Sequence, residues 1–188
     1  MKRSLLTIVL VMTLILTAVP AIRAVQASIE VPTTTFAVAK LGDVTIVLRE
    51  GMPDTIVARG QKFVAYDFYF SINGVNYLAD AFLSSNLTLQ NDTAPLKFDH
   101  EGAFKFKSGE DMFILEYEGV AHKTKDVEMH TKTLDSYGHF VITEGTGVFA
   151  GLKGVMGTYT LTLMCEKMPG EHKKVGDPVQ VTFSAMSQ

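Results

Sequence analysis

The feature that most constrains the fold is residues 63–83, FVAYDFYFSINGVNYLADAFL. Asn73-Gly74 at its centre is the preferred pair for a two-residue type I′ turn, because both central positions need a positive φ. Side chains alternate along a strand, so this turn fixes which residues oppose each other. From Ile72–Val75 outward, the predicted pairs on one face are Phe70–Tyr77, Phe68–Ala79, Tyr66–Ala81 and Val64–Leu83. Every pair is apolar, which predicts a long hairpin that buries one face against further sheet.

The opposite face of this hairpin carries two carboxylates. The same register places Asp67 directly opposite Asp80. Like charges in that position destabilise a sheet. If the face lined a cavity, one carboxyl would stay protonated and could act as a general acid. The catalytic prediction is therefore Asp67 and Asp80 as an acid pair, and the alternative is two carboxylates in water beside lysines.

The N-terminal residues have the pattern of a secretory signal peptide. Lys2 and Arg3 precede an apolar run over residues 5–19, Pro20 ends the run, and small residues at 25–27 suit signal peptidase. An uncleaved anchor is the alternative, but 15 residues fall short of the roughly 20 that span a bilayer. We therefore predict a secreted protein without stable membrane insertion after cleavage.

The predicted organisation is a signal peptide over residues 1–27 and one domain over residues 28–188, which is long enough for a hydrophobic core. Cleavage of the signal peptide would remove three of the 17 basic residues. The remaining chain has 14 basic and 20 acidic side chains, a net charge of −6. This balance argues against nucleic acid or an anionic membrane as the main partner. The single Cys165 excludes an internal disulfide; its setting in YTLTLMC favours a buried thiol over a bond to another chain.

Alternation with a period of two continues along the chain. Further strands are predicted around residues 44–48, 104–106, 113–117, 127–131, 140–142, 159–165 and 179–183. Residues 84–95 are polar and are predicted to form a surface loop, with Asn86 and Asn91 in N-glycosylation patterns. Eight to ten strands without a helical period predict an all-β fold, a single antiparallel β-barrel, with a sandwich as the alternative.

Residues 144–160, EGTGVFAGLKGVMGTYT, are the most distinctive segment. Gly145-x-Gly147 is similar to a phosphate loop, but neither a helix nor GK[ST] follows, which argues against nucleotide binding. We predict a tight turn between strands, because glycines adopt positive φ and let backbones approach closely. Phe149 would then pack into the core.

The segment HFVITEGTGVFAGLKGVMGTYTLT resembles the pattern (I/V)TGGTG-x-F-x-G-x-x-G of the allene oxide cyclase and dirigent barrel-like superfamily. The resemblance covers residues 140–163, and Glu144 departs from it. It implies an eight-stranded barrel, with the structural positions Gly145, Gly147, Phe149, Gly151, Gly154 and Gly157. Plant members guide reactive intermediates in an apolar cavity without a metal or organic cofactor. The resemblance also implies a homo-oligomer, either a dimer or a trimer. No active-site residue of the superfamily has a match in this sequence outside the glycine motif.

Three functions are compatible with the sequence. The first is a secreted barrel that binds a small apolar molecule inside. The second is a cofactor-free cyclase or dirigent-like protein that uses Asp67 and Asp80, and the third is a structural or interaction domain with a filled core. The predicted cavity lining is Tyr66, Phe68, Phe70, Tyr77, Phe113, Tyr117 and Tyr159. Eight-stranded barrels are either filled or hollow, so cavity volume separates these functions.

No metal or organic cofactor is predicted. The five histidines are scattered, and Glu128 and His130 share a strand face without the spacing of a metal site. Met164, Cys165 and Met168 offer soft ligands for Cu(I), but neighbours on a strand point to opposite faces, which favours core packing. The motifs GxSxG, HExxH and the EF-hand loop do not occur, so hydrolase and calcium-binding functions lack support.

Overall fold

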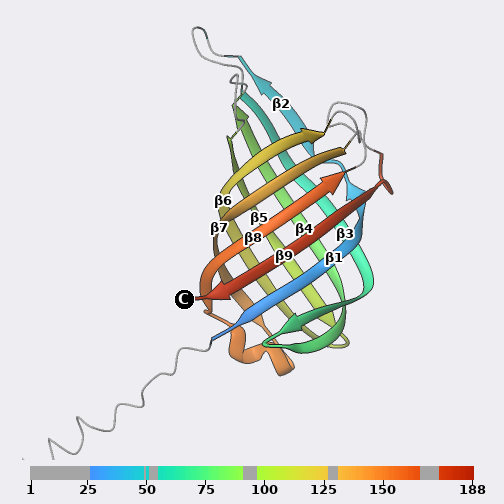
Figure 1. Cartoon of the computed structure of the whole chain (residues 1–188), viewed down its shortest axis with the longest axis vertical. Coiled ribbons are helices and arrows are strands. Elements are labelled where there is room, and N and C mark those ends of the chain that lie inside the picture. The colour runs from blue at the N-terminus through green and yellow to red at the C-terminus, as the bar shows by residue number, and fades with distance from the viewer. Residues whose placement is uncertain (1–25, 49, 51–54, 91–96, 127–130, 166–173) are drawn as a thin grey trace, which may run out of the picture.

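The computed structural model describes residues 26–48, 50, 55–90, 97–126, 131–165 and 174–188. These residues form nine antiparallel strands and one short 3₁₀ helix, η1, between β7 and β8 (Figure 1). The strands are β1 (Ser28–Lys40), β2 (Asp43–Val47), β3 (Thr55–Ile72), β4 (Val75–Gln90), β5 (Lys97–Ser108), β6 (Asp111–Asp126), β7 (Thr131–Gly145), β8 (Met156–Cys165) and β9 (Pro178–Ser187). In the described part of the chain, no helix has the length and apolar character needed to cross a membrane.

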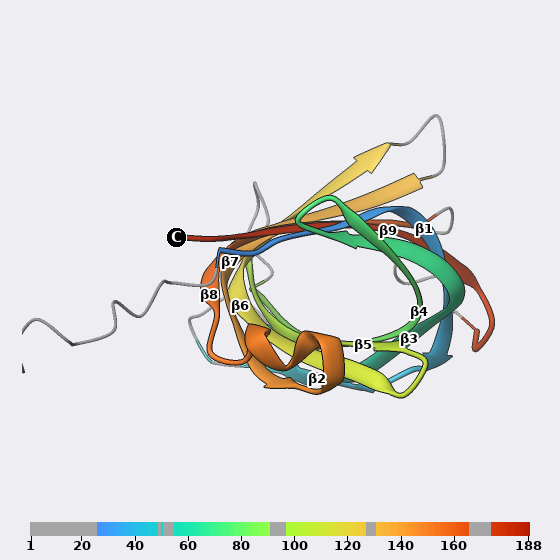
Figure 2. The same cartoon turned by 90° about the horizontal axis from the view of Figure 1, so that it is seen from below.

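The sheet closes on itself into an eight-stranded barrel (Figure 2). Around the ring the strands follow the order β1-β9-β8-β7-β6-β5-β4-β3, and β1 pairs with β3 to close it. Strand β2 is additional, and in the described residues it pairs with β3 alone. The predicted all-β fold with a single antiparallel barrel of eight to ten strands is therefore confirmed.

The predicted hairpin turn forms and also helps to close the barrel. Asn73 and Gly74 have φ values of 51° and 79°, as a type I′ turn requires. The predicted pairs form as far as Phe68–Ala79. The Asn73 N–H donates to the Ser28 carbonyl at 2.9 Å, and the Ser28 N–H donates to Asn73 Oδ1 at 2.8 Å. One turn residue thus connects the hairpin to the start of β1.

Beyond Phe68 the predicted register is wrong, because Tyr66 and Asp67 form a β-bulge. Asp67 has a φ of 52°, and Ala65 takes the place opposite Ala81 that Tyr66 was predicted to hold. The pairs from Ala65 back to Gln61 shift by one residue, and a second irregularity shifts those from Ala58 to Thr55 by another. An extra residue reverses the direction of a side chain, so Tyr66 lies on the outer face of the barrel and is 62% exposed.

Three other predictions about the strands need correction. Strand β4 continues to Gln90, so Asn86 lies within a strand, while Asn91 lies outside the described residues. Strand β7 is one long element that includes residues 140–142, and residues 127–130 of another predicted strand are not described. Strand β2 is not half-buried as predicted: Val44 is 62% exposed, because β2 extends beyond the closed ring.

The glycine-rich segment forms η1 (Gly147–Leu152) rather than a tight turn, and it packs against one end of the barrel. The prediction that Phe149 packs into the core is confirmed: its ring centroid lies 5.1 Å from that of Tyr77 and 5.3 Å from that of Phe113. Gly147 has a φ of 52°, and a Cβ there would collide with the Asp111 carboxylate. That carboxylate accepts the Val148 N–H at 3.2 Å. A Cβ on Gly151 would meet open space, so packing does not require that glycine.

The first strand of the barrel begins at Ser28, and the residue before it also contacts the barrel. Ala27 is buried, its N–H donates to Ser187 Oγ at 2.7 Å, and its carbonyl accepts the Ser187 N–H at 2.9 Å. Ala27, which we assigned to the signal peptide, therefore contacts the last strand.

Replacing Phe149 by alanine is expected to destabilise the fold by about 3–5 kcal/mol, because a large aromatic leaves a cavity that neighbours fill incompletely. The adjacent Val148 is 68% exposed, so Val148→Ala should change the free energy of unfolding by less than about 0.5 kcal/mol. Urea denaturation of the two variants measures this difference. Equal effects would contradict the assignment of Phe149 as the residue that anchors η1.

Candidate functional site

Five polar side chains meet inside the barrel and form what we call the interior network: Ser85, His100, Tyr117, Ser136 and Tyr159. They come from the five adjacent strands β4 to β8, and all are buried. Each occupies an inward position of its strand. The alternation that builds the hydrophobic core therefore also brings these polar groups together.

His100 is the centre of the interior network. Its Nδ1 lies 2.8 Å from Ser136 Oγ, and its Nε2 lies 2.8 Å from Ser85 Oγ and 3.2 Å from the Tyr117 hydroxyl. Ser136 Oγ in turn lies 2.9 Å from the Tyr159 hydroxyl. Every buried side-chain nitrogen or oxygen in the described residues has a hydrogen-bond partner, so the network is complete.

The donors and acceptors fit one protonation state. The Tyr117 hydroxyl donates to the Ser84 carbonyl at 3.2 Å, so it has no proton left for His100. It can accept the Nε2 proton instead, which makes Nδ1 the acceptor for Ser136. Ser136 then accepts from Tyr159, and every hydroxyl has a partner. Ser85 Oγ, the nearer partner of Nε2 at 2.8 Å, can instead donate to it while Nδ1–H donates to Ser136, so the contacts fit a neutral imidazole in either tautomer.

Burial keeps the network uncharged. Desolvation lowers the pKa of His100 from 6.5 to about 4. It also raises the pKa of Tyr117 and of Tyr159 above the usual value of 10. A histidine with so low a pKa is a weak base near neutral pH, and general bases work best with a pKa near the working pH. The interior network is therefore better suited to fixing the core than to proton transfer.

Glycines at inward positions make room for the two tyrosines. Gly102 stands opposite Tyr117, and Gly138 stands opposite Tyr159. A Cβ on Gly102 would collide with the Tyr117 hydroxyl. Each ring thus occupies space next to a position that has no side chain, a common arrangement in strongly bent sheets.

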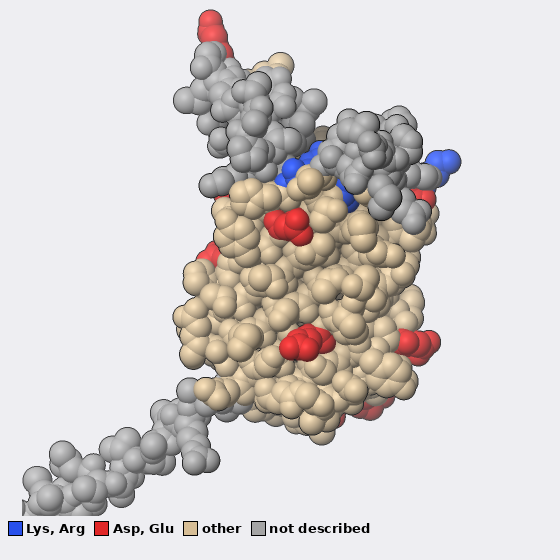
Figure 3. Space-filling model, in the orientation of Figure 1, with Lys and Arg blue, Asp and Glu red and all other residues tan. Residues whose placement is uncertain are grey.

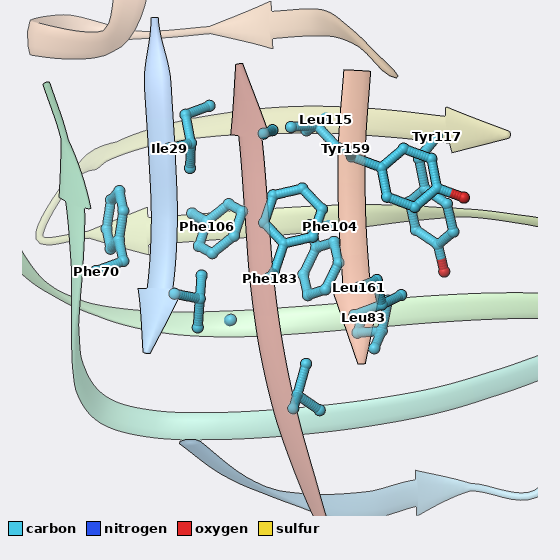
Figure 4. Close-up of a cluster of buried hydrophobic side chains, with 14 of the residues drawn as sticks. Ile29, Phe70, Leu83, Phe104, Phe106, Leu115, Tyr117, Tyr159, Leu161 and Phe183 are labelled. Carbon is cyan, nitrogen blue, oxygen red and sulfur yellow. The ribbon is translucent and has the colours of Figure 1, made fainter. Parts of the chain in front are cut away.

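Six of the seven predicted cavity-lining residues lie on the inner side of the barrel: Phe68, Phe70, Tyr77, Phe113, Tyr117 and Tyr159. Figure 4 shows Tyr117 and Tyr159 side by side at one end of the cluster, with their ring centroids 5.1 Å apart. The prediction for Tyr66 is wrong, because the bulge turns this residue outward.

The space that these residues surround is filled by other side chains. The centroid of the Phe106 ring lies 5.0 Å from that of Phe70 (Figure 4). It lies 4.7 Å from the centroid of Phe113. A cavity large enough for water would expose the side chains around it. Phe104, Phe106 and Phe113 are nevertheless 0% exposed. The described interior leaves no room for a small molecule beside these rings.

Asp67 and Asp80 lie next to each other, but on the outer face of the barrel and not in a cavity. The bulge sets Tyr66 and Asp67 together opposite Asp80, and the Asp67 N–H donates to Asp80 Oδ1 at 3.2 Å. Asp67 is exposed, and Asp80 stands opposite Lys107 of β5. Both lie on the outer face, so the alternative of two carboxylates in water beside a lysine describes their position.

A groove of about 850 Å³ lies on the outer face over β4 to β8. Its outward residues include Asn86, Glu101, Ala103, Glu116, Glu118, His139, Val141 and Met156. Glu101 stands directly opposite Glu118 on the neighbouring strand, and Arg59 Nη1 lies 3.9 Å from Glu101 Oε1. A hollow of about 450 Å³ shares Glu101, Glu118 and His139 with the groove. These carboxylates are open to solvent, where like charges repel only weakly.

The outer face over β1, β8 and β9 carries few charged side chains (Figure 3). Several of its hydroxyl groups bond to each other or to a neighbouring carboxylate. Thr33 Oγ1 lies 2.8 Å from Thr182 Oγ1, and the Thr162 hydroxyl donates to Asp135 Oδ1 at 2.7 Å. These contacts fix side chains across the strands without pointing to a ligand.

The side chains that sequence reasoning weighed as metal ligands are not brought together in the described part of the structure. Among the described residues, no group of three or more histidine, cysteine, aspartate or glutamate side chains could hold a metal ion. Glu128, His130, Met168 and His172 lie outside the described residues. Cys165 is half-buried at the end of β8.

Comparison with protein-family models, curated proteins and solved structures finds no match to this chain. The barrel agrees with the fold that the glycine motif implies. A barrel alone does not identify the allene oxide cyclase and dirigent superfamily, because one fold serves many unrelated functions.

Sequence reasoning missed the interior network, although the signal was present. His100 stands four residues before Phe104, and Ser85 stands two residues after Leu83, so both continue the inward positions of their strands. Two assumptions hid this pattern. The predicted β4 ended too early, at the supposed loop over residues 84–95, and the predicted β5 began too late, after Gly102.

Lowering the pH is expected to destabilise the fold through His100. The unfolded chain binds a proton near pH 6.5, whereas the folded chain binds one only near pH 4, so stability falls as the pH falls between these values. The loss should reach about 3 kcal/mol once the pH is below 4. NMR titration of the imidazole measures the folded-state pKa directly, and an ordinary value near 6.5 would contradict this account. Urea denaturation of His100→Gln should show a smaller pH dependence, whereas the exposed His139→Gln should match the unmodified protein.

Proposed function

We propose that this protein is a secreted β-barrel interaction module, in which a filled barrel is the scaffold and the outer surface binds the partner. The observation that carries the proposal is the complete burial of the inward aromatic rings, with Phe104, Phe106 and Phe113 at 0% exposure. Ligand-binding barrels need an internal cavity of roughly 300–1,000 Å³. The signal-like N-terminus supports an extracytoplasmic location.

The outside of the barrel has surfaces that could bind a partner. The outer groove has a volume of about 850 Å³ and is lined by both carboxylate and apolar side chains. Elsewhere on the outside, Tyr66 and Tyr69 are more than 60% exposed. Tyrosine is enriched at protein interfaces, because its ring contributes contact area and its hydroxyl tolerates water. These features support a function in which the outer face makes the contacts.

Binding of a small apolar ligand inside the barrel is the second candidate. The aromatic wall predicted for it exists, from Phe68 to Tyr159, and the superfamily resemblance supports it. A ligand would have to separate rings that now touch. A cyclase or dirigent-like activity meets the same obstacle and would also need a proton donor other than Asp67 and Asp80, which lie outside.

An engineered cavity distinguishes a filled barrel from a hollow one. Phe106→Ala should create an apolar cavity that binds benzene, so benzene should raise the unfolding temperature of this variant. The unmodified protein should show no such rise. Calorimetric unfolding with and without benzene measures both. If Phe106→Ala folds poorly, Leu115→Ala removes a smaller buried side chain at 0% exposure and serves the same purpose.

Stabilisation of the unmodified protein by benzene would contradict the proposal and favour an internal binding site. The same conclusion would follow if native mass spectrometry detected a stoichiometric small molecule bound to the purified protein. Changes in the assigned NMR chemical shifts of Tyr117 and Tyr159, which lie inside, would locate that molecule in the barrel.

A further inference from the structure

The outer groove over β4 to β8 has an acidic side and an apolar side. Three exposed carboxylates line the acidic side, from Glu101 of β5 and from Glu116 and Glu118 of β6. Val141 of β7 and Met156 of β8 line the apolar side, and Met156 is 65% exposed. A groove with both kinds of side chain suits a partner that carries positive charge and apolar groups together.

The register of the sheet sets the order of these side chains. Glu101 stands directly opposite Glu118, and Glu116 lies two residues from Glu118 on the same face of β6. The next strand places Val141 opposite Glu116, and Met156 stands opposite Val141. Neighbouring strands lie about 4.8 Å apart, so the groove changes from acidic to apolar over about 10–14 Å.

Basic side chains lie beyond the edges of the groove. Among the described residues that line it, there is no lysine or arginine. Lys62 of β3 stands opposite Ser84, at the β4 edge. Lys105 of β5 and Glu144 of β7 stand on either side of Ile114 and carry opposite charges. The lining itself therefore carries three negative charges, with histidine counted as neutral.

Arg59 pairs with one of the three carboxylates, and the other two remain without a basic partner. Arg59 Nη1 lies 3.9 Å from Glu101 Oε1, and both side chains are partly exposed. In the described part of the chain, no basic group lies within 4.0 Å of Glu116 or Glu118. An occupant of the groove would displace the water around these carboxylates, and unpaired charges removed from water are costly. The occupant therefore has to bring positive charge.

We propose that the outer groove binds an extended peptide segment of a partner protein, in which two basic side chains precede two apolar ones at alternate positions. The segment crosses the strands from β5 to β8, with its basic side chains over Glu116 and Glu118 and its apolar side chains against Val141 and Met156. Alternate side chains of an extended chain point the same way about 6.6 Å apart, so four of them cover this distance. The inference rests on the proposed function, because it names the class of partner for the outer surface.

Other occupants fit the outer groove less well. The three carboxylates would repel a nucleic acid or an anionic lipid surface. The aromatic rings that touch the groove, Tyr117 and Phe140, are each 3% exposed, so they offer no face on which a sugar could stack. A metal ion needs several ligands in one place, and no group of described residues supplies them.

Fluorescence anisotropy with the labelled synthetic peptide RTRTLTL tests this proposal. Its arginines and leucines occupy alternate positions. The unmodified protein should bind it with a dissociation constant of roughly 10–100 µM at low salt. Binding should weaken at about 0.5 M NaCl, because salt screens exposed charges. Two control peptides, ETETLTL with reversed charge and RTRTSTS without apolar side chains, should each bind at least about fivefold more weakly.

Substitution of the two unpaired carboxylates tests the acidic side. Glu116→Gln combined with Glu118→Gln should raise the dissociation constant of RTRTLTL about fivefold or more. Glu30→Gln with Asp43→Asn is the matched control, because it removes the same charge from exposed positions on β1 and β2, and it should leave the dissociation constant unchanged. Glu116→Lys with Glu118→Lys should reverse the preference and bind ETETLTL instead. All these positions are exposed, so circular dichroism should show an unchanged fold.

Met156→Gln tests the apolar side and the direction of the peptide. Exchanging the leucines of the peptide for serine should weaken binding less in this variant than in the unmodified protein, because the contact is already lost. A double-mutant cycle measures that coupling. Additive effects would place the leucines elsewhere and would overturn the proposed orientation and with it the inference.

Absence of RTRTLTL binding at about 1 mM, or equal weakening by the groove and control variants, would overturn the inference. Equally tight binding of spermine or of RTRTSTS would also overturn it, in favour of a surface that attracts any polycation. None of these outcomes affects the filled-barrel proposal, which the benzene experiment tests separately.

Discussion

The pairing of β1 with β3 is the contact on which the rest of the structure depends. Closing a sheet removes its two free edges and lets inward side chains from every strand share one core. The pairing extends from Ile29–Ile72 to Lys40–Lys62, and the Asn73–Ser28 hydrogen bonds anchor its lower end. The residue that fixes the β3–β4 turn therefore also fixes the place where β1 begins. Without this closure the inward rings of β3 and β4 would face solvent on one side.

A short run of sequence predicted much of the fold, because the features in that run are local. The turn at Asn73-Gly74 and the alternation beside it follow from local geometry, and local geometry can be read from neighbouring residues. The burial of Phe149 could also be predicted locally, because it is a large apolar side chain in a segment of small glycines. Strand count and fold class followed from repeated alternation. None of these features required knowledge of distant contacts.

The errors arose where distant contacts decide the outcome. The bulge at Tyr66–Asp67 has no clear local signal, because an apolar tyrosine suits the inward position just as well. At the bulge, the Asp67 N–H donates to Asp80 of β4 at 3.2 Å, a contact that the neighbouring sequence does not announce. The interior network was missed for a related reason: a histidine and two serines resemble surface residues until five strands place them together. Asp67 and Asp80 remain neighbours across the bulge, but they lie on the outer face.

The interior network also bears on where function can lie. A buried polar network adds little net stability compared with apolar packing, but it penalises every register that leaves one of its members unpaired. Ser85, His100 and Ser136 can therefore hold β4, β5 and β7 in register around a filled core. The same alternation that fills the interior leaves Phe82 on the outside, the bulge places Tyr66 beside it, and their rings meet edge-on. Closely packed rings within and exposed rings without both support the proposal that the outer surface makes the contacts.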